Sequence, residues 1–290
     1  MRITEGRLVA LAAARSISAQ SRFAESGDKV STGIAVDRPS DDPVAWASGQ
    51  RARLRHASSS ARGSNIATAS EQLASTDGAL DSLGQIFSRL KELSIQSSNE
   101  TLGLAARQNI ALEVRGLFSQ ALASANTRGP TGEYLFGGSR GDSAPFSDTG
   151  VYGGDGIASE VETAEGNLQI VSITGESLTA AAGVDILVVM SDFATALEAN
   201  DVPTLQTMVG QLGTAIEQIS GARSSVGAMM SALDNAEHSR TAFELNLAQT
   251  IANAVETDPI AAAAELAQTS QALETAHAVT TRVVDLLRPR

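Results

Sequence analysis

The sequence of 290 residues has no cysteine and only three histidines, His56, His238 and His277. The absence of thiols excludes a disulfide scaffold, a thiol nucleophile and any cysteine-ligated zinc or iron–sulfur site. Glu274-x-x-His277 has half of the spacing used by di-iron carboxylate sites, which require a second copy and further glutamates. We therefore expect no metal and no cofactor.

Aromatic residues make up only 3% of the chain, and its only lysines are Lys29 and Lys91. The hydrophobic share of 42% is supplied largely by alanine. Alanine is the best helix former and buries little area per residue. This composition favours long, thin helices over the thick core of a compact enzyme.

The formal net charge is −12, and residues 129–200 contain eleven acidic residues but only one basic residue, Arg140. An acidic chain is poorly suited to neutralising phosphates, so we expect no nucleic-acid binding. No run approaches 18 apolar residues, which predicts no membrane insertion. Arg15 interrupts the apolar run of residues 8–14, so we expect a retained helix here and not a cleaved signal peptide.

Start and stop signals divide the first half into helices. Ser31-Thr32-Gly33 predicts the end of the first helix, since glycine commonly follows a helix C-terminus. Asp42-Pro43 predicts the next start, with an aspartate cap and a proline at the first helical position. Apolar residues then recur every three or four positions, which is the spacing of a coiled-coil seam: Leu73, Thr76, Leu80, Leu83, Phe87 and Leu90. We expect a break near 99–103 and a further helix that stops at 129–130.

The middle of the chain has a different texture. Residues 129–156 hold nine of the 25 glycines. The β-branched runs 169–174 and 184–189 predict strands between glycines. We interpret 131–202 as a β-rich outer insert, and we expect its residues 137–200 to tolerate change well.

The second half mirrors the first. A seam of three–four spacing runs from Val226 to Ala254, and Asp258-Pro259 repeats the cap-and-proline start. A last seam contains Leu266, Ser270, Leu273, His277, Thr280, Val284 and Leu287. The terminal helices have few large apolar side chains. They are consistent either with segments that become stable only between subunits or with two helices docked within one monomer.

The predicted fold class is therefore mainly α. We expect an elongated, antiparallel, coiled-coil-like helical rod with both termini at one end and an inserted small β-rich domain. The expected domains are a terminal helical domain (1–42 and 256–290), a helical rod domain (43–130 and 203–255) and the insert.

Residues 137–141 match G-x-S-x-G, the nucleophile elbow of serine hydrolases, with Ser139 as the nucleophile. The elbow needs a strand before it and a helix after it, and the following residues 142–146 cannot form a useful helix. Residues 150–156 lack the following helix or lysine that a phosphate-binding loop requires. We expect no enzyme activity, and keep a secreted serine hydrolase only as an alternative to be tested.

Two motifs resemble the flagellin superfamily of bacteria, and within it the hook–filament junction family. The first is Ser31-Thr32-Gly33 followed by Pro39-Ser40-Asp41-Asp42-Pro43, where Pro43 favours the junction family over flagellins proper. The second is Gly132-Glu133-Tyr134-Leu135-Phe136-Gly137-Gly138 followed by Ala144-Pro145-Phe146. The ending Leu286-Leu287-Arg288 is more like that of many flagellins, so a filament-forming flagellin stays as the alternative.

The resemblance implies a non-enzymatic structural subunit, exported through the flagellar type III apparatus and located outside the cell. It implies self-association in a ring or helical assembly. The implied partners are the first hook-associated protein, flagellin and an export chaperone. The residues we expect to matter for assembly are Ser40, Asp41, Asp42, Pro43, Tyr134, Phe136, Leu266, Leu273, Val284 and Leu287.

Overall fold

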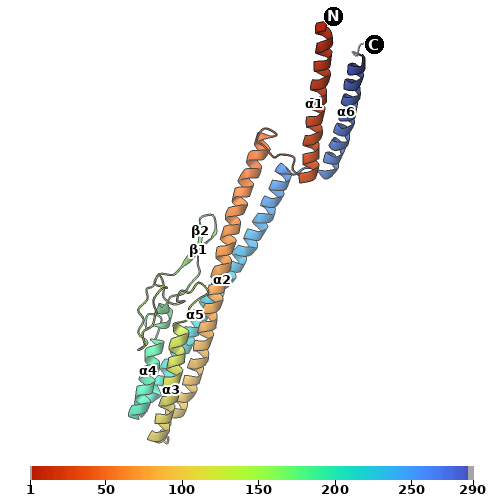
Figure 1. Cartoon of the computed structure of the whole chain (residues 1–290). Helices are drawn as coiled ribbons and strands as arrows, with labels where there is room; N and C mark the ends of the chain where they lie inside the picture. The colour runs from red at the N-terminus through yellow and green to blue at the C-terminus, as the bar shows by residue number, and fades with distance from the viewer. Residues whose placement is uncertain (1, 287–290) are drawn as a thin grey trace. The chain divides into compact units, whose positions relative to one another are not determined.

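The computed structural model describes residues 2–286, and within them the chain forms six α-helices and one two-stranded sheet (Figure 1). The elements are α1 (Arg2–Thr32), α2 (Pro43–Ser97), α3 (Leu104–Ala125), β1 (Glu160–Ala164), β2 (Asn167–Ile170), the 3₁₀ helix η1 (Gly175–Leu178), α4 (Ile186–Ala199), α5 (Val202–Val255) and α6 (Pro259–Leu286). The predicted mainly α class with a small β insert is confirmed. None of the described helices is long and apolar enough to span a bilayer.

The chain divides into two compact units, and the divisions fall inside α2 and α5. Unit 1 contains the described residues up to 58 and from 243 onward, and unit 2 contains residues 59–242. The boundaries that we expect at residues 42 and 256 lie next to the start of α2 and the end of α5. Both α2 and α5 contribute residues to each unit.

Unit 1 contains the antiparallel pair α1 and α6. The Ser26 and Thr269 hydroxyls lie 2.6 Å apart, and the Thr280 hydroxyl is 3.3 Å from the carbonyl oxygen of Ala12. These contacts pair the start of α1 with the end of α6, so the described chain ends lie at the same end of the pair (Figure 1). In the rest of the unit, the start of α2 packs against the end of α5. A Cβ on Gly49 would clash with the Val255 side chain.

The buried side chains of unit 1 are few and mostly small. Among its described residues, those with a side chain below about a tenth exposed are Ala12, Ser26, Ala52, Leu247, Val255 and Ala262, and Gly49 is buried as well. Small side chains bury little apolar area, and so they contribute little to the free energy of folding. Unit 1 therefore has only a thin core.

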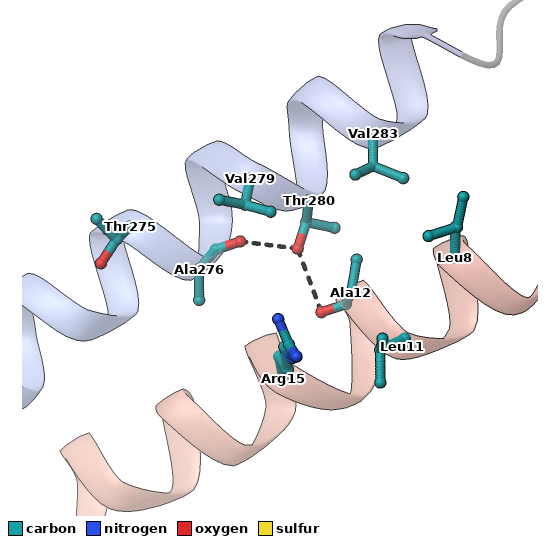
Figure 2. Close-up of a pocket in the computed structure, with 9 residues that line it drawn as sticks. All are labelled: Leu8, Leu11, Ala12, Arg15, Thr275, Ala276, Val279, Thr280 and Val283. Carbon is teal, nitrogen blue, oxygen red and sulfur yellow. Dashed lines mark hydrogen bonds between the residues drawn. The ribbon is translucent and has the colours of Figure 1, made fainter.

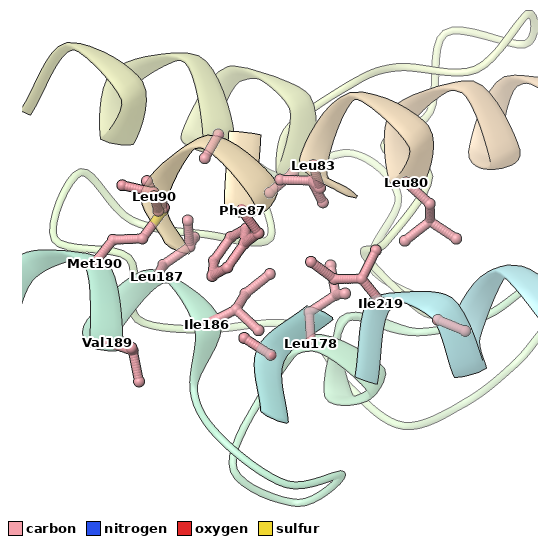
Figure 3. Close-up of a cluster of buried hydrophobic side chains, with 14 of the residues drawn as sticks. Leu80, Leu83, Phe87, Leu90, Leu178, Ile186, Leu187, Val189, Met190 and Ile219 are labelled. Carbon is pink, nitrogen blue, oxygen red and sulfur yellow. The ribbon is translucent and has the colours of Figure 1, made fainter. Parts of the chain in front are cut away.

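Unit 2 contains the main hydrophobic core of the described chain. All six residues of the seam predicted on α2, from Leu73 to Leu90, are buried, which confirms that prediction. Figure 3 shows Phe87 and Leu90 of α2 beside Ile186 and Met190 of α4. The core is thus built from the inner helices together with part of the insert.

The sheet is a hairpin in which β1 and β2 pair antiparallel, with Glu160 opposite Ile170 and Glu162 opposite Leu168. The strand predicted over 169–174 is only partly correct, because β2 ends at Ile170. The strand predicted over 184–189 is wrong. The Asp185 carboxylate accepts a hydrogen bond from the Val188 amide and caps α4, which begins at Ile186.

Part of the insert packs into the core of unit 2, whereas our expectation for residues 137–200 assumed that they carry little of the packing. Phe146, Leu178, Leu187 and Phe193 are all 2% exposed or less and belong to the core of unit 2. The insert therefore supplies large apolar side chains that the Ala-rich helices lack.

Candidate assembly surface

The start of α2 is fixed by two neighbouring aspartates. The Asp42 carboxylate accepts hydrogen bonds of 2.9 Å from the Val44 and Ala45 amides, which confirms the predicted cap. The Asp41 carboxylate accepts from the amides of residues 37 and 38 and from the Ser40 hydroxyl. The hydrogen bonds to Asp41, above all that from the Arg38 amide, lower the pKa of its carboxyl. Pro43 is the first residue of the helix, where its missing N–H costs nothing.

The connection before α2 is tied to the connection before α6. The Val255 carbonyl accepts hydrogen bonds from the amides of Ala35 and Val36, at 2.7 and 3.2 Å. The Thr257 amide donates to the Gly33 carbonyl at 2.9 Å. Gly33 has φ +72°, in the left-handed region that glycine adopts without strain. The two linkers of unit 1 thus form one hydrogen-bonded joint.

A groove between α1 and α6 exposes apolar side chains (Figure 2). Leu8, Leu11 and Val279 are each more than half exposed, and Arg15 lies in the wall of the groove. These residues were not among the assembly residues expected from the sequence. The spacing of Leu8, Leu11 and Arg15 places them on one face of a helix. The adjacent alanines, however, make other faces of the same helix apolar as well, so the sequence pattern does not select one face.

The residues predicted on α6 are only partly directed at α1. Leu266 and Leu273 are half-buried, and they share a helix face with Thr269 and Thr280, which contact α1. His277 is exposed, and Val284 is 40% exposed. Near the C-terminal end, Ala276 and Val283 take the inward positions instead. Leu287 lies outside the described residues.

The second motif anchors the insert to unit 2. The Arg128 guanidinium lies 4.3 Å from the centre of the Tyr134 ring and also donates to the Tyr134 hydroxyl. Phe136 is fully buried, and its carbonyl accepts hydrogen bonds from the Tyr152 hydroxyl and the Gly175 amide. Both aromatic residues of the motif thus have a structural explanation where the chain leaves α3.

Ser139 lies in a loop, and its hydroxyl donates a hydrogen bond to the Asp155 carboxylate. The Ser139 amide donates to the same carboxylate at 2.8 Å. The hydrogen bonds from Ser139, first of all that from its hydroxyl, lower the pKa of Asp155. A serine nucleophile needs a base that accepts its proton, and a carboxylate of lowered pKa is a poor one.

Metal ligation has no support either. Among the residues for which the structure gives coordinates, no three His, Asp or Glu side chains are grouped so that they could hold a metal ion. The candidate functional features of the described chain are therefore helix faces and linkers.

Comparison with known proteins agrees with this assignment. Residues 7–140 match the family described as bacterial flagellin N-terminal helical region. Over 164 residues the chain is 27% identical to flagellar hook-associated protein 3 of Escherichia coli K12, an alignment that covers 56% of this chain. The chain spans about half the length of the curated relatives that it matches. The share is 51% of the Escherichia coli protein and 47% of flagellar hook-associated protein 3 of Salmonella typhimurium.

Solved structures share the fold. A flagellar hook-associated protein from Vibrio parahaemolyticus superposes with a TM-score of 0.68 at 20% identity, over 74% of this chain and 100% of that one. The flagellar junction protein FlgL from Legionella pneumophila superposes with a TM-score of 0.59 at 18% identity, over 72% of this chain and 100% of that one.

Proposed function

We propose that this chain, a protein of the flagellin superfamily, is the structural subunit that joins the hook of a bacterial flagellum to its filament. The similarity to hook-associated protein 3 supports a place in the flagellum and a structural, non-enzymatic role. The proposed location is extracellular, at the hook–filament junction. The proposed partners are further copies of this chain in a ring or helical assembly, the first hook-associated protein, flagellin and an export chaperone.

The observation that supports this proposal best is the thin core of unit 1. Leu8, Leu11 and Val279 remain more than half exposed in the single chain, beside a core of mostly small residues. Burying a leucine contributes about 1.5–3 kcal/mol, and only a neighbouring subunit would supply that burial. A helix pair of this kind is expected to gain its stability in the assembly.

The decisive experiment is electron microscopy of cells that lack the gene. We expect intact hooks without attached filaments, and flagellin released into the medium. Normal hooks and filaments would refute the proposed role. If filaments are lost and no polymerisable flagellin is found either, the result would favour the alternative, a filament-forming flagellin.

A point substitution tests the role of α6. Leu273→Asp places a charge on the half-buried face toward α1, and we expect the exported protein to no longer attach filaments. The matched control is Ala278→Asp, which adds the same charge at an exposed position of the same helix. Normal motility of cells with Leu273→Asp would contradict the assembly role of this face.

A further inference from the structure

The start of α2 exposes a basic face that has no acidic partner nearby in the sequence. Arg51, Leu54 and Arg55 are exposed at positions i, i+3 and i+4, and so they lie on one side of the helix. Val44, two turns earlier on the same side, is 77% exposed, and Leu54 is 71% exposed. We call Val44, Arg51, Leu54 and Arg55 the basic face.

Within the described residues, the arginines of the basic face have no ionic partner, and Arg51 donates only to the Ala47 carbonyl of its own helix. No Asp or Glu occurs between residues 43 and 70, so no carboxylate stands three or four positions away to stabilise the helix. Across the described residues, no ion pair involves Arg51 or Arg55. Ala52, between them in sequence, is the residue of this turn that is buried.

The hairpin of unit 2 exposes a surface of opposite charge. Because side chains alternate along strands, Glu160, Glu162, Leu168 and Ile170 lie on one face. Leu168 is 62% exposed and Ile170 is 44% exposed, while Thr163 is buried. Glu165 is exposed at the turn. We call Glu160, Glu165, Leu168 and Ile170 the acidic hairpin face.

One glutamate of the hairpin already pairs with an arginine of its own chain. Arg62 of α2 donates a hydrogen bond of 3.2 Å to Glu162 of the same unit. A second arginine–glutamate contact of the same kind would add charge complementarity, which favours correct pairing of surfaces over wrong ones.

We propose that the basic face of one copy docks on the acidic hairpin face of a second copy. Arg51 and Arg55 face Glu160 and Glu165, and Leu54 packs between Leu168 and Ile170. The two faces are different surfaces, so the contact is head-to-tail and extends into a ring or a helical array. This inference rests on the proposed function insofar as that function requires assembly of copies.

Disulfide cross-linking tests the contact directly, because the natural chain has no cysteine. Full-length Leu54→Cys and Leu168→Cys proteins are mixed at high concentration and oxidised, and the same pair is coexpressed and oxidised in isolated flagella. In the matched control, the second protein carries Ile157→Cys in place of Leu168→Cys. Ile157 lies in the same insert and is 63% exposed. We expect a heterodimer with a yield about tenfold above the control pair, since a disulfide forms only where the Cα atoms approach within about 7 Å.

Charge exchange tests the chemistry. One variant carries Arg51→Glu and Arg55→Glu, and the other carries Glu160→Arg and Glu165→Arg. All four side chains are exposed, so helix content by circular dichroism should be unchanged. With Leu54→Cys added to the first and Leu168→Cys to the second, the heterodimer yield should stay within about threefold of the unreversed pair. Reversal of one face alone should lower the yield about tenfold.

Two outcomes would overturn the inference: no heterodimer in either preparation, or a yield equal to that of the Ile157→Cys control. Neither of these bears on the proposed function, which fails only if cells without the gene keep normal filaments.

Discussion

At the scale of single residues, Arg107 closes one end of unit 2. Its side chain is 2% exposed, and its guanidinium donates to the carbonyls of Ser97 and Asn99 and to the side-chain oxygen of Asn200. These acceptors lie at the C-terminal ends of α2 and α4, where the helix dipole is negative. Within the described part of the chain, no carboxylate forms an ion pair with Arg107. Helix ends therefore take the place of a counter-ion.

Replacing Arg107 by Met should lower the free energy of unfolding of unit 2 by about 3 kcal/mol, since it removes three hydrogen bonds and leaves the carbonyl of the buried Ser97 without this donor. The measurement is urea unfolding of the full chain at pH 7, followed by circular dichroism. The control is Arg115→Met, which removes an exposed ion pair with Glu198 and should change stability far less. Equal losses in both variants would show that the buried hydrogen bonds contribute little.

Ser139→Ala should raise the pKa of Asp155 toward its ordinary value, because the hydroxyl that stabilises the carboxylate is removed. A carboxyl whose pKa is lower in the folded than in the unfolded chain stabilises the fold at every pH above its unfolded-state pKa. This stabilisation is lost as the pH falls through the folded-state pKa. At pH 7 the Asp155 carboxyl is ionised, so the natural protein keeps the whole of this stabilising contribution. The contribution should be lost only at acid pH, below about 3.8. NMR titration of the Asp155 carboxyl measures the shift.

The same variant tests for hydrolase activity. Ester hydrolysis by the natural protein and by Ser139→Ala should be equally close to background. Activity that disappears in the variant would identify Ser139 as a nucleophile and contradict the structural role.

At the scale of elements, the sequence predicted best where large apolar residues were isolated among polar ones. The Leu73–Leu90 seam has one consistent stripe, and the structure buries all of it. On α6, adjacent apolar pairs such as Val283 and Val284 fit two stripes, and the sequence could not choose between them. In α4, β-branched residues 184–189 matched a strand, but the Asp185 cap and the helical spacing of Ile186, Met190 and Phe193 prevailed.

The cap residues at the start of α2 were predictable for a different reason. An aspartate followed by proline has a specific local use as a helix start, and Asp42 makes the expected bonds. The groove residues Leu8 and Val279 were not predictable, because their exposure depends on how two distant helices pair. Helix capping could therefore be predicted from the sequence, and the pairing of distant helices could not.

The Asp42 cap gives a prediction for α2. Asp42→Ala should cost about 1 kcal/mol of local stability, and the amides of the first turns should exchange about fivefold faster. Asp42→Asn is the matched control, since asparagine caps helices about as well. Hydrogen exchange of residues 44–50 is the measurement, and unchanged exchange in Asp42→Ala would mean that the cap is dispensable.

The hairpin and the remainder of the insert should respond differently to deletion. The Val171 amide donates to the Ser159 carbonyl at 2.9 Å, so a short glycine linker can replace residues 160–170. We expect this deletion to keep the helix content and to lower the melting temperature slightly. Deletion of residues 137–200 should abolish cooperative unfolding, because it removes Phe146, Leu187 and Phe193 from the core. Thermal unfolding by circular dichroism distinguishes the two.

At the scale of the whole molecule, stability should be unevenly distributed between the units. Unit 2 has the large apolar core, and unit 1 buries mostly small side chains. Amide hydrogens of α1 and α6 should therefore exchange faster in dilute monomer than those of residues 73–90. Hydrogen exchange with mass spectrometry measures this, and equal protection of both units would contradict a stability that depends on assembly.

The hydrogen-bonded joint between the linkers has a mechanical consequence. Each linker by itself is a single chain whose backbone bonds can rotate. The bonds from Ala35 and Val36 to Val255 and from Thr257 to Gly33 tie the two linkers together. Rotation of one linker against the other would strain all three hydrogen bonds. The pair of linkers should therefore resist a twist that either linker alone would allow.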